Sequence, residues 1–288
     1  MDEKAQTGVV IDLARALGLS VYRAERIGGY ANALYRLHPL PLVARVAGPE
    51  TMRRGGCEWM AQELRVARHL ASRGVQATSP ATLCPPGPHR HAGEMITFWQ
   101  FLPTVPDRPS PRRVGRELAL LHAALADFED DLPLLAPLEE SWQIFDRLLV
   151  GEPILAPEDL ALTRERIARV RDRLAGEFAN CRPLHGDPHH GNLLATPEGW
   201  AWSDFEDACR GPVEWDIASA IASSVVLGTG AAARDVLAAL DIGPDPELLD
   251  TMIEARTLMG MAWALVAGTR PASDPRMRSR LDWLATRG

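Results

Sequence analysis

The sequence predicts an α+β fold of two lobes, and three observations lead to this prediction. Strand-like segments come first and helical segments follow, which favours a separate sheet and a separate helical layer. Four prolines between residues 103 and 111 mark a connector. The charge also changes there, because residues 1–101 carry 12 basic and 8 acidic side chains and residues 102–288 carry 19 and 30. We therefore expect lobes at 1–101 and 102–288, the first suited to phosphates and the second to a cationic partner.

The expected first lobe is a mainly antiparallel sheet with one long helix. Apolar residues at a 3.6-residue period predict a short helix at its start, and two apolar stretches flank a Gly-Gly turn. Gly74 closes the long helix in the position where glycine commonly ends helices. The predicted helices cover residues 8–18 and about 57–72, and the predicted strands cover 21–27, 33–37, 42–46 and 95–101.

The expected second lobe is mostly helical, with one β-like interruption between residues 183 and 204. Within it, Thr196-Pro197-Glu198-Gly199 has proline at the second and glycine at the fourth position of a turn, which predicts a β-hairpin. The predicted helices cover about 112–127, 140–149, 158–178, 213–227, 231–240 and 246–268.

Composition is typical of a globular enzyme and excludes several other classes of protein. Hydrophobic residues make up 46% and charged residues 24%. The acidic start of the chain is unlike a signal peptide, and the longest apolar stretch, residues 218–226, is too short to span a bilayer. The arginines of residues 164–173 alternate with acidic residues, as on a solvated helix face. We therefore expect a cytoplasmic protein without membrane or nucleic-acid partners.

Two residue types restrict the chemistry further. Lys4 is the only lysine, so a phosphate loop that ends in Gly-Lys followed by Ser or Thr is excluded. The four cysteines have no Cys-x-x-Cys spacing, so we expect free thiols and neither a zinc ribbon nor a disulfide framework.

Acidic and amide side chains lie around the predicted hairpin. Asn192 comes before its first strand and Asp204 follows its second, so the two are expected about 5 Å apart, one strand spacing. Hard oxygen ligands at that distance can share a magnesium ion. Asp187 lies on the loop that enters the hairpin and can face the same metal-bound phosphate from the acceptor side. This is the layout of phosphoryl transfer, in which a base carboxylate orients the acceptor hydroxyl while Asn and Asp hold the metal.

Three linked motifs over about 35 residues resemble the aminoglycoside phosphotransferase and choline kinase superfamily. Residues 185–192, His-Gly-Asp-Pro-His-His-Gly-Asn, are similar to its H-G-D-x-H-x-x-N loop. Residues 203–206, Ser-Asp-Phe-Glu, and 211–218, Gly-Pro-Val-Glu-Trp-Asp-Ile-Ala, are similar to the segments that follow that loop. The resemblance implies a bilobal protein-kinase-like fold with ATP or GTP as phosphoryl donor, Mg²⁺ as cofactor and a small-molecule hydroxyl as acceptor. Asp187 is then the catalytic base.

The resemblance extends more loosely to the first lobe. Gly28, Gly29 and Asn32 are similar to the family's glycine turn, whose backbone N–H groups contact the nucleotide phosphates. A pair of glycines is also an ordinary hairpin turn, so this assignment depends on the resemblance. Gln100 and Leu102 occupy the place of the hinge, where backbone groups read the adenine edge.

Arg45 stands where kinases carry a lysine on the third strand. Arginine keeps the positive charge and can clamp phosphates, but it presents a planar fork instead of a point charge. Glu63 resembles its helix partner, and Glu58, one helix face away, is the rival.

Residues 185–190 also permit a metallohydrolase, because clustered histidine and aspartate bind zinc. Their order differs from the metallo-β-lactamase type, and the remaining histidines all lie upstream, which favours the kinase interpretation. We expect His185 to brace its loop, His122 to be a satisfied core histidine, and Asp216 to tie the backbone of the catalytic loop in place.

Two further functions stay open. Trp142, Trp215 and Trp263 can form an aromatic box for a quaternary ammonium, as a choline or amino-alcohol kinase requires, although tryptophans at helical spacing are usually core. The other is a non-catalytic kinase fold that binds nucleotide as a regulatory module. The intact base and metal ligands argue against it.

The acidity of residues 102–288 predicts a hydroxylated amine or polycation as acceptor, with aminoglycoside-like compounds ahead of choline-like ones. The alternative is that this acidity only aids solubility. The carboxylates expected on helices facing the cleft are Glu139, Glu140, Asp146, Asp250 and Glu254.

Overall fold

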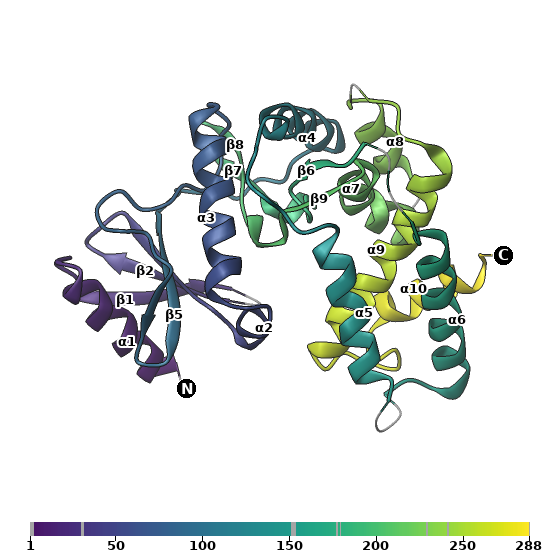
Figure 1. Cartoon of the computed structure of the whole chain (residues 1–288), viewed down its shortest axis with the longest axis horizontal. Helices are drawn as coiled ribbons and strands as arrows, with labels where there is room; N and C mark the ends of the chain where they lie inside the picture. The colour runs from purple at the N-terminus through teal and green to yellow at the C-terminus, as the bar shows by residue number, and fades with distance from the viewer. Residues whose placement is uncertain are drawn as a thin grey trace. The chain divides into compact units, whose positions relative to one another are not determined.

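The computed structural model describes residues 3–29, 32–150, 154–176, 178, 180–228, 230–240 and 242–287. Tyr30 and Ala31, within the expected glycine turn, lie outside the described residues. The chain divides into two compact units (Figure 1): the first comprises Met1–Asp107 with Leu194–Glu206, and the second comprises Arg108–Leu193 with Asp207–Gly288. The functional division expected between residues 1–101 and 102–288 stays a prediction.

A five-stranded antiparallel sheet with the order β1-β2-β3-β5-β4 forms the first unit's centre. The central strand β3 pairs with both β2 and β5. It is buried at every position, so both of its faces are covered. The strands are β1 (Arg23–Gly28), β2 (Ala33–His38), β3 (Leu42–Val46), β4 (His89–His91) and β5 (Glu94–Gln100).

Helices cover this sheet. Helix α1 (Glu3–Ala16) buries Val10 and Leu13 in one core cluster with Tyr35 and Phe98 of the sheet. Helix α3 (Cys57–Ser72), preceded by the short α2 (Pro49–Arg53), has the bounds that the sequence predicts. The first helix begins earlier than the expected residue 8, because the polar turn at its start is helical as well.

The predicted hairpin is present, and it belongs to the first unit. Its strands are β7 (Leu193–Thr196) and β8 (Gly199–Trp202). Trp202 is 1% exposed, and its backbone bonds both Gln76 and Thr78 in the segment after α3, at 3.0 and 2.9 Å. These contacts fix the residues that follow β8 relative to the sheet.

The second unit is helical around one long helix, α9 (Pro246–Val266), which packs against α5, α6, α7 and α10. A two-stranded sheet of β6 (Arg182–Leu184) and β9 (Cys209–Gly211) flanks the loop of residues 185–192. The remaining helices are α4 (Pro111–Leu125), α5 (Ala136–Leu148), α6 (Pro157–Arg173), α7 (Glu214–Leu227), α8 (Ala231–Leu237) and α10 (Pro275–Ala285).

The predicted α+β fold is therefore confirmed, with strands first and helices later. Helix α10 was not predicted, although Asp274 caps its first turn and Met277, Leu281 and Leu284 bury one face of it. Within the described ranges, no helix is both long and apolar enough to cross a bilayer.

Candidate active site

The first unit contributes a buried cluster centred on Arg45 of β3. Arg45 is 7% exposed, and its Nη1 forms an ion pair with Glu63 of α3. Its Nη2 lies 3.0 Å from Asp204 Oδ1 and 2.7 Å from Glu206 Oε2. Glu63, and not the exposed Glu58, is thus the helix partner of Arg45.

This cluster holds more negative than positive charge. Burial raises the pKa of Glu63 to about 8; Arg45 opposes this shift, and the nearby carboxylates of Asp204 and Glu206 add to it. Burial alone lowers the pKa of Arg45, but Glu63, Glu206 and Asp204 raise it overall, so the guanidinium stays charged. Even with Glu63 protonated, the two carboxylates on Nη2 outnumber one guanidinium.

Asp204 is the member of the cluster that reaches solvent. Its side chain is 45% exposed, compared with 2% for Glu63 and 13% for Glu206. Its backbone is left-handed, with φ of 67°, a conformation that costs a non-glycine residue free energy and that is common at functional sites. The bend directs the chain away from β8 and back into the short η2 helix (Phe205–Asp207).

Asn32 connects the glycine turn to the same cluster. Its Nδ2 donates to Glu206 Oε2 at 2.8 Å, and its Oδ1 accepts from Gly48 N at 3.0 Å and Thr51 Oγ1 at 2.7 Å. A Cβ at Gly29 would lie 1.7 Å from the carbonyl oxygen of Asn32, so only glycine fits there. The side chain of Asn32 thus links Glu206 to the start of α2, a structural role that the sequence did not predict.

The two expected hinge residues differ. The N–H of Gln100 donates to the carbonyl of Ser79 at 2.8 Å, which removes it as a donor to adenine. The backbone of Leu102 has no hydrogen-bond partner among the described residues. Leu102 therefore fits a hinge role better than Gln100.

The second unit positions Asp187 on the loop after β6. Arg256 of α9 forms an ion pair with Asp187 Oδ1, and Oδ2 lies 3.7 Å from Nε2 of His189. Burial alone would raise the pKa of Asp187, but Arg256, His189 and His185 together lower it below its usual value. Arg256 lies with its guanidinium carbon 5.2 Å from the ring centre of Trp215. No motif indicates Arg256, because it lies 69 residues from Asp187, on another helix.

Asp216 braces this loop, as predicted. Its Oδ2 accepts from the backbone N–H of His185 at 3.0 Å, and its Oδ1 accepts from that of Gly186 at 2.9 Å. Nε2 of His122 lies 2.9 Å from Oδ2, and both side chains are almost fully buried. His122 is therefore a core histidine, as predicted, but only its Nε2 is satisfied, because Nδ1 has no hydrogen-bond partner among the described residues. Trp215 Nε1 donates to the carbonyl of Gly186 at 2.8 Å, which makes this tryptophan part of the brace.

The rest of the loop is held locally. Nδ1 of His185 accepts from the N–H of Asp187 at 3.3 Å, as expected for a bracing histidine. Asn192, in the short η1 helix (His190–Asn192), donates Nδ2 to the carbonyl of Asp187 at 2.9 Å. With Nδ2 engaged in this way, Oδ1 is the atom of Asn192 with metal-ligand chemistry. A Cβ at Gly186 would lie 1.8 Å from the carbonyl oxygen of Asp207, which requires glycine in the loop.

The magnesium prediction fits the chemistry of the first unit. In the part of the chain that the structure describes, no three His, Cys, Asp or Glu side chains form a ready metal cluster. The uncompensated negative charge at the Arg45 cluster nevertheless favours a divalent cation, and Asp204 offers an accessible hard oxygen there. Asn192 belongs to the other unit.

Three solved structures share the fold over nearly the whole chain. The choline kinase LicA from Streptococcus pneumoniae is 16% identical, with a TM-score of 0.72 over 97% of this chain and 99% of that chain. The amicoumacin kinase hAmiN, in complex with AMP-PNP, Ca²⁺ and Ami, is 15% identical, with a TM-score of 0.73 over 98% and 95%. The GDP and kanamycin complex of APH(2″)-IIia is 15% identical, with a TM-score of 0.65 over 96% and 97%. At these identities the matches establish the fold.

A family model described as the phosphotransferase enzyme family, APH, matches residues 23–252. That span contains all three motifs on which the predicted resemblance depends, together with Arg45 and Glu63. The resemblance is thereby confirmed. The chain belongs to the APH phosphotransferase enzyme family and is a small-molecule kinase.

Proposed function

We propose that the protein transfers the γ-phosphoryl group of ATP or GTP to a hydroxyl group of a small, cationic molecule, with Asp187 as the base. The observation that supports this most directly is the state of Asp187. Its carboxylate is held ionised by Arg256 on a loop that Asp216 fixes through two backbone N–H groups. A carboxylate so held is ready to orient a hydroxyl before transfer begins.

The two oxygens of Asp187 have different roles in this proposal. Oδ1 is occupied by Arg256, so Oδ2 accepts the hydrogen bond from the acceptor hydroxyl. As the hydroxyl oxygen bonds to the γ-phosphorus and the bond to the β,γ-bridging oxygen breaks, the hydroxyl proton passes to Oδ2. The lowered pKa makes Asp187 a weak base, which suits a loose transition state in which the proton moves late.

The nucleotide would bind to residues that the first unit supplies. Gly28 and Gly29 present backbone N–H groups to the phosphates. Arg45, which Glu63 holds in place, anchors the phosphates. Leu102 reads the base. Asp204 and Asn192 would hold Mg²⁺, which when bound offsets the charge of the phosphates. Arg45 already pairs with three carboxylates, so contact with a phosphate requires that Nη2 exchange one of them.

The acceptor is proposed to be aminoglycoside-like, with choline-like amino alcohols as the alternative. Of the five acidic residues expected to face the cleft, Glu254 is 0% exposed, and Asp146 and Asp250 form ion pairs with arginines. The proposal of a cationic acceptor therefore depends mainly on Glu139, which is exposed.

The tryptophans disfavour the choline-like alternative. Trp215 is fully buried, and its Nε1 is engaged by the loop of Asp187. Trp142 is 6% exposed and packs under Arg171, whose guanidinium carbon lies 5.3 Å from its ring centre. Two of the three rings expected for an aromatic box are therefore core residues, as tryptophans at helical spacing usually are.

The proposed function is tested by acceptor-dependent release of ADP or GDP over a panel of aminoglycosides, amino alcohols, neutral sugars and acidic metabolites. The Asp187→Asn variant measures the rate of ADP or GDP release in the absence of the base. Glu139→Ala should raise KM for a cationic acceptor while nucleotide KM stays constant. A neutral or acidic best acceptor would contradict the cationic class and leave the kinase intact. Nucleotide binding without turnover on any acceptor would favour the non-catalytic module.

A further inference from the structure

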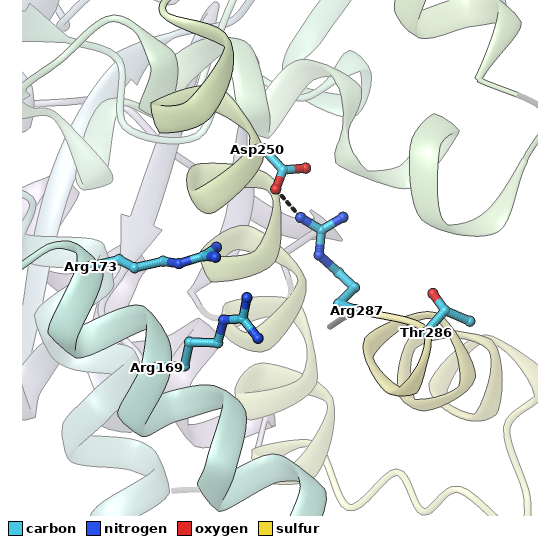
Figure 2. A pocket seen from close by; sticks show the side chains of 5 residues that line it. All are labelled: Arg169, Arg173, Asp250, Thr286 and Arg287. Carbon is cyan, nitrogen blue, oxygen red and sulfur yellow. Dashed lines mark hydrogen bonds and ion pairs between the residues drawn. The ribbon is translucent and has the colours of Figure 1, made fainter.

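A basic hollow lies in the second unit between α6, α9 and the residues that follow α10. It has a volume of about 280 Å³ and is lined by Arg169, Arg173, Asp250, Thr286 and Arg287 (Figure 2). Three of these five residues are arginines. The sequence predicts a solvated helix face for the arginines of α6, but Arg169 and Arg173 line a concave surface.

The two α6 arginines of this hollow form no ion pair with any residue that the structure describes. Arg169 and Arg173 are one helical turn apart, and neither has a hydrogen-bond or ion-pair partner among the described residues. Figure 2 shows both guanidinium groups extending from α6 toward α9. Arg287 approaches from the other side and is engaged by Asp250 of α9. The hollow therefore has two available guanidinium forks and one that a carboxylate already holds.

A buried pair next to the hollow is also short of partners. Arg166, three residues before Arg169 on α6, is 5% exposed, and its Nε and Nη1 have no hydrogen-bond partner in the described part of the chain. Glu254 is 0% exposed, with neither oxygen hydrogen-bonded there. Its oxygens lie 3.9 Å from Arg166 Nη1 and 3.5 Å from Arg287 Nε. Buried charges left without hydrogen bonds are costly, so this wall of the hollow is electrostatically incomplete.

The local charge balance is positive. Four arginines, at positions 166, 169, 173 and 287, face two buried or hollow-lining carboxylates, Glu254 and Asp250, which leaves two positive charges, and the exposed Glu165, 3.6 Å from Arg166, offsets only part of them across solvent. One dianion would neutralise them. Arginine forks recognise phosphoryl and carboxylate oxygens through paired hydrogen bonds, so the geometry suits an oxyanion.

The hollow is separate from the loop of Asp187. Asp250 and Glu254 are four residues apart and share one face of α9. Arg256, which holds Asp187, follows Glu254 by two residues and is therefore rotated by about 200° around the helix. The hollow and Asp187 thus lie on different faces of α9.

We propose that this hollow binds a compact dianionic oxyanion, such as the phosphoryl or carboxylate groups of a small metabolite. Its volume is at the lower limit of small-molecule pockets, about 300–1,000 Å³, which favours a ligand larger than a single ion but smaller than a nucleotide. Binding there links α6 to α9 and to the end of the chain. The proposal does not depend on the proposed function.

Isothermal titration calorimetry of the full chain with pyrophosphate, at constant ionic strength, tests the proposal without an activity assay. Arg169→Gln combined with Arg173→Gln should weaken binding at least tenfold. The matched control combines Arg164→Gln with Arg171→Gln, which removes the same charge from the same helix outside the hollow and should change affinity less than twofold. Inorganic phosphate and citrate, titrated in parallel, distinguish a phosphoryl from a carboxylate ligand.

A third variant reverses the expected sign. Asp250→Asn frees Nη2 of Arg287, whose Nε still faces Glu254, and should tighten pyrophosphate binding severalfold, which general damage to the fold would not do. The proposal is overturned if wild type shows no saturable binding, or if the two double variants lose affinity equally. It is also overturned if the Arg169 and Arg173 variant binds as tightly as wild type, since the anion then binds elsewhere.

Discussion

Each unit of the molecule contains an arginine paired with carboxylate, the buried Arg45 in the first and the partly buried Arg256 in the second, but the two clusters have opposite charge balance. Around Arg45, three carboxylates share one guanidinium, and burial raises the pKa of Glu63. Around Asp187, one carboxylate faces an arginine and two histidines, and its pKa is lowered. The first cluster has negative charge that a cation can neutralise. The second keeps the carboxylate of Asp187 ionised. Similar ion pairs therefore support two different roles, cation binding in the first unit and base catalysis in the second.

The largest effect is expected from removing the charge that the second cluster maintains. Asp187→Asn should lower kcat by about 10²–10⁴, because a positioned acid–base group is lost. Nucleotide affinity should be unchanged, since the first unit is untouched. Steady-state kinetics with titration calorimetry measure both quantities. Turnover within a few-fold of wild type would show that Asp187 is not the base.

Removal of the exposed carboxylate of the first cluster should have the next largest effect. Asp204→Ala takes away a hard oxygen ligand and should abolish magnesium-dependent nucleotide binding, whereas Asn192→Ala should weaken it less. Calorimetry with and without Mg²⁺ separates loss of the metal from loss of the fold. If the affinity of Asp204→Ala for Mg-nucleotide is unchanged, Asp204 is not a magnesium ligand.

The sequence predicted the carboxylates of both clusters but only part of their surroundings. Asp187, Asp204 and Asp216 lie in short motifs, where spacing along the chain reports on local geometry, and the brace made by Asp216 was foreseen. Arg256 lies 69 residues from its partner and is in no motif, so the spacing carried no information about it. Glu206 stands in the motif of residues 203–206, but the spacing says nothing of its ion pair with Arg45, which comes from a distant strand.

Surface charge was the weakest basis for prediction. The acidic excess of residues 102–288 was interpreted as a cationic acceptor surface, yet Glu254 is buried beside Arg166. A net charge obtained from composition does not show which charged side chains are buried or paired with an opposite charge. Helix packing, which decides which carboxylate meets which arginine, is set by contacts among α6, α9 and α10 that composition does not encode.

Arg256 tests whether the second cluster tunes Asp187 or only packs against it. Because the pKa of Asp187 is lowered, activity should persist to a pH below the ordinary aspartate pKa of 3.8 and fall only as pH passes through the lowered value. Arg256→Met should move this fall in activity to higher pH, because the effect of burial on the pKa of Asp187 is then opposed only by His189 and His185. Arg256→Lys should restore it in part.

The matched control for Arg256 is Arg171→Met, which removes an arginine from another tryptophan of the same unit. Arg171→Met should weaken packing around Trp142 but leave unchanged the acidic pH at which activity falls. A pH–rate profile that is unchanged in Arg256→Met would mean that the arginine has a purely structural role.

The smallest effect is expected at Glu63, and it concerns the first cluster's excess of carboxylates. A folded-state pKa of about 8 means that the native state keeps a proton that the unfolded state releases near 4.5. Wild-type stability should therefore fall, relative to Glu63→Gln, as pH rises between these values, by up to about 1.4 kcal/mol per pH unit. Denaturant unfolding at several pH values measures this slope, and Glu58→Gln, exposed on the same helix, should follow the wild-type curve. If Glu63 is instead ionised at neutral pH, Glu63→Gln removes the ion pair at Arg45 Nη1 and should destabilise the fold at every pH above 4.5.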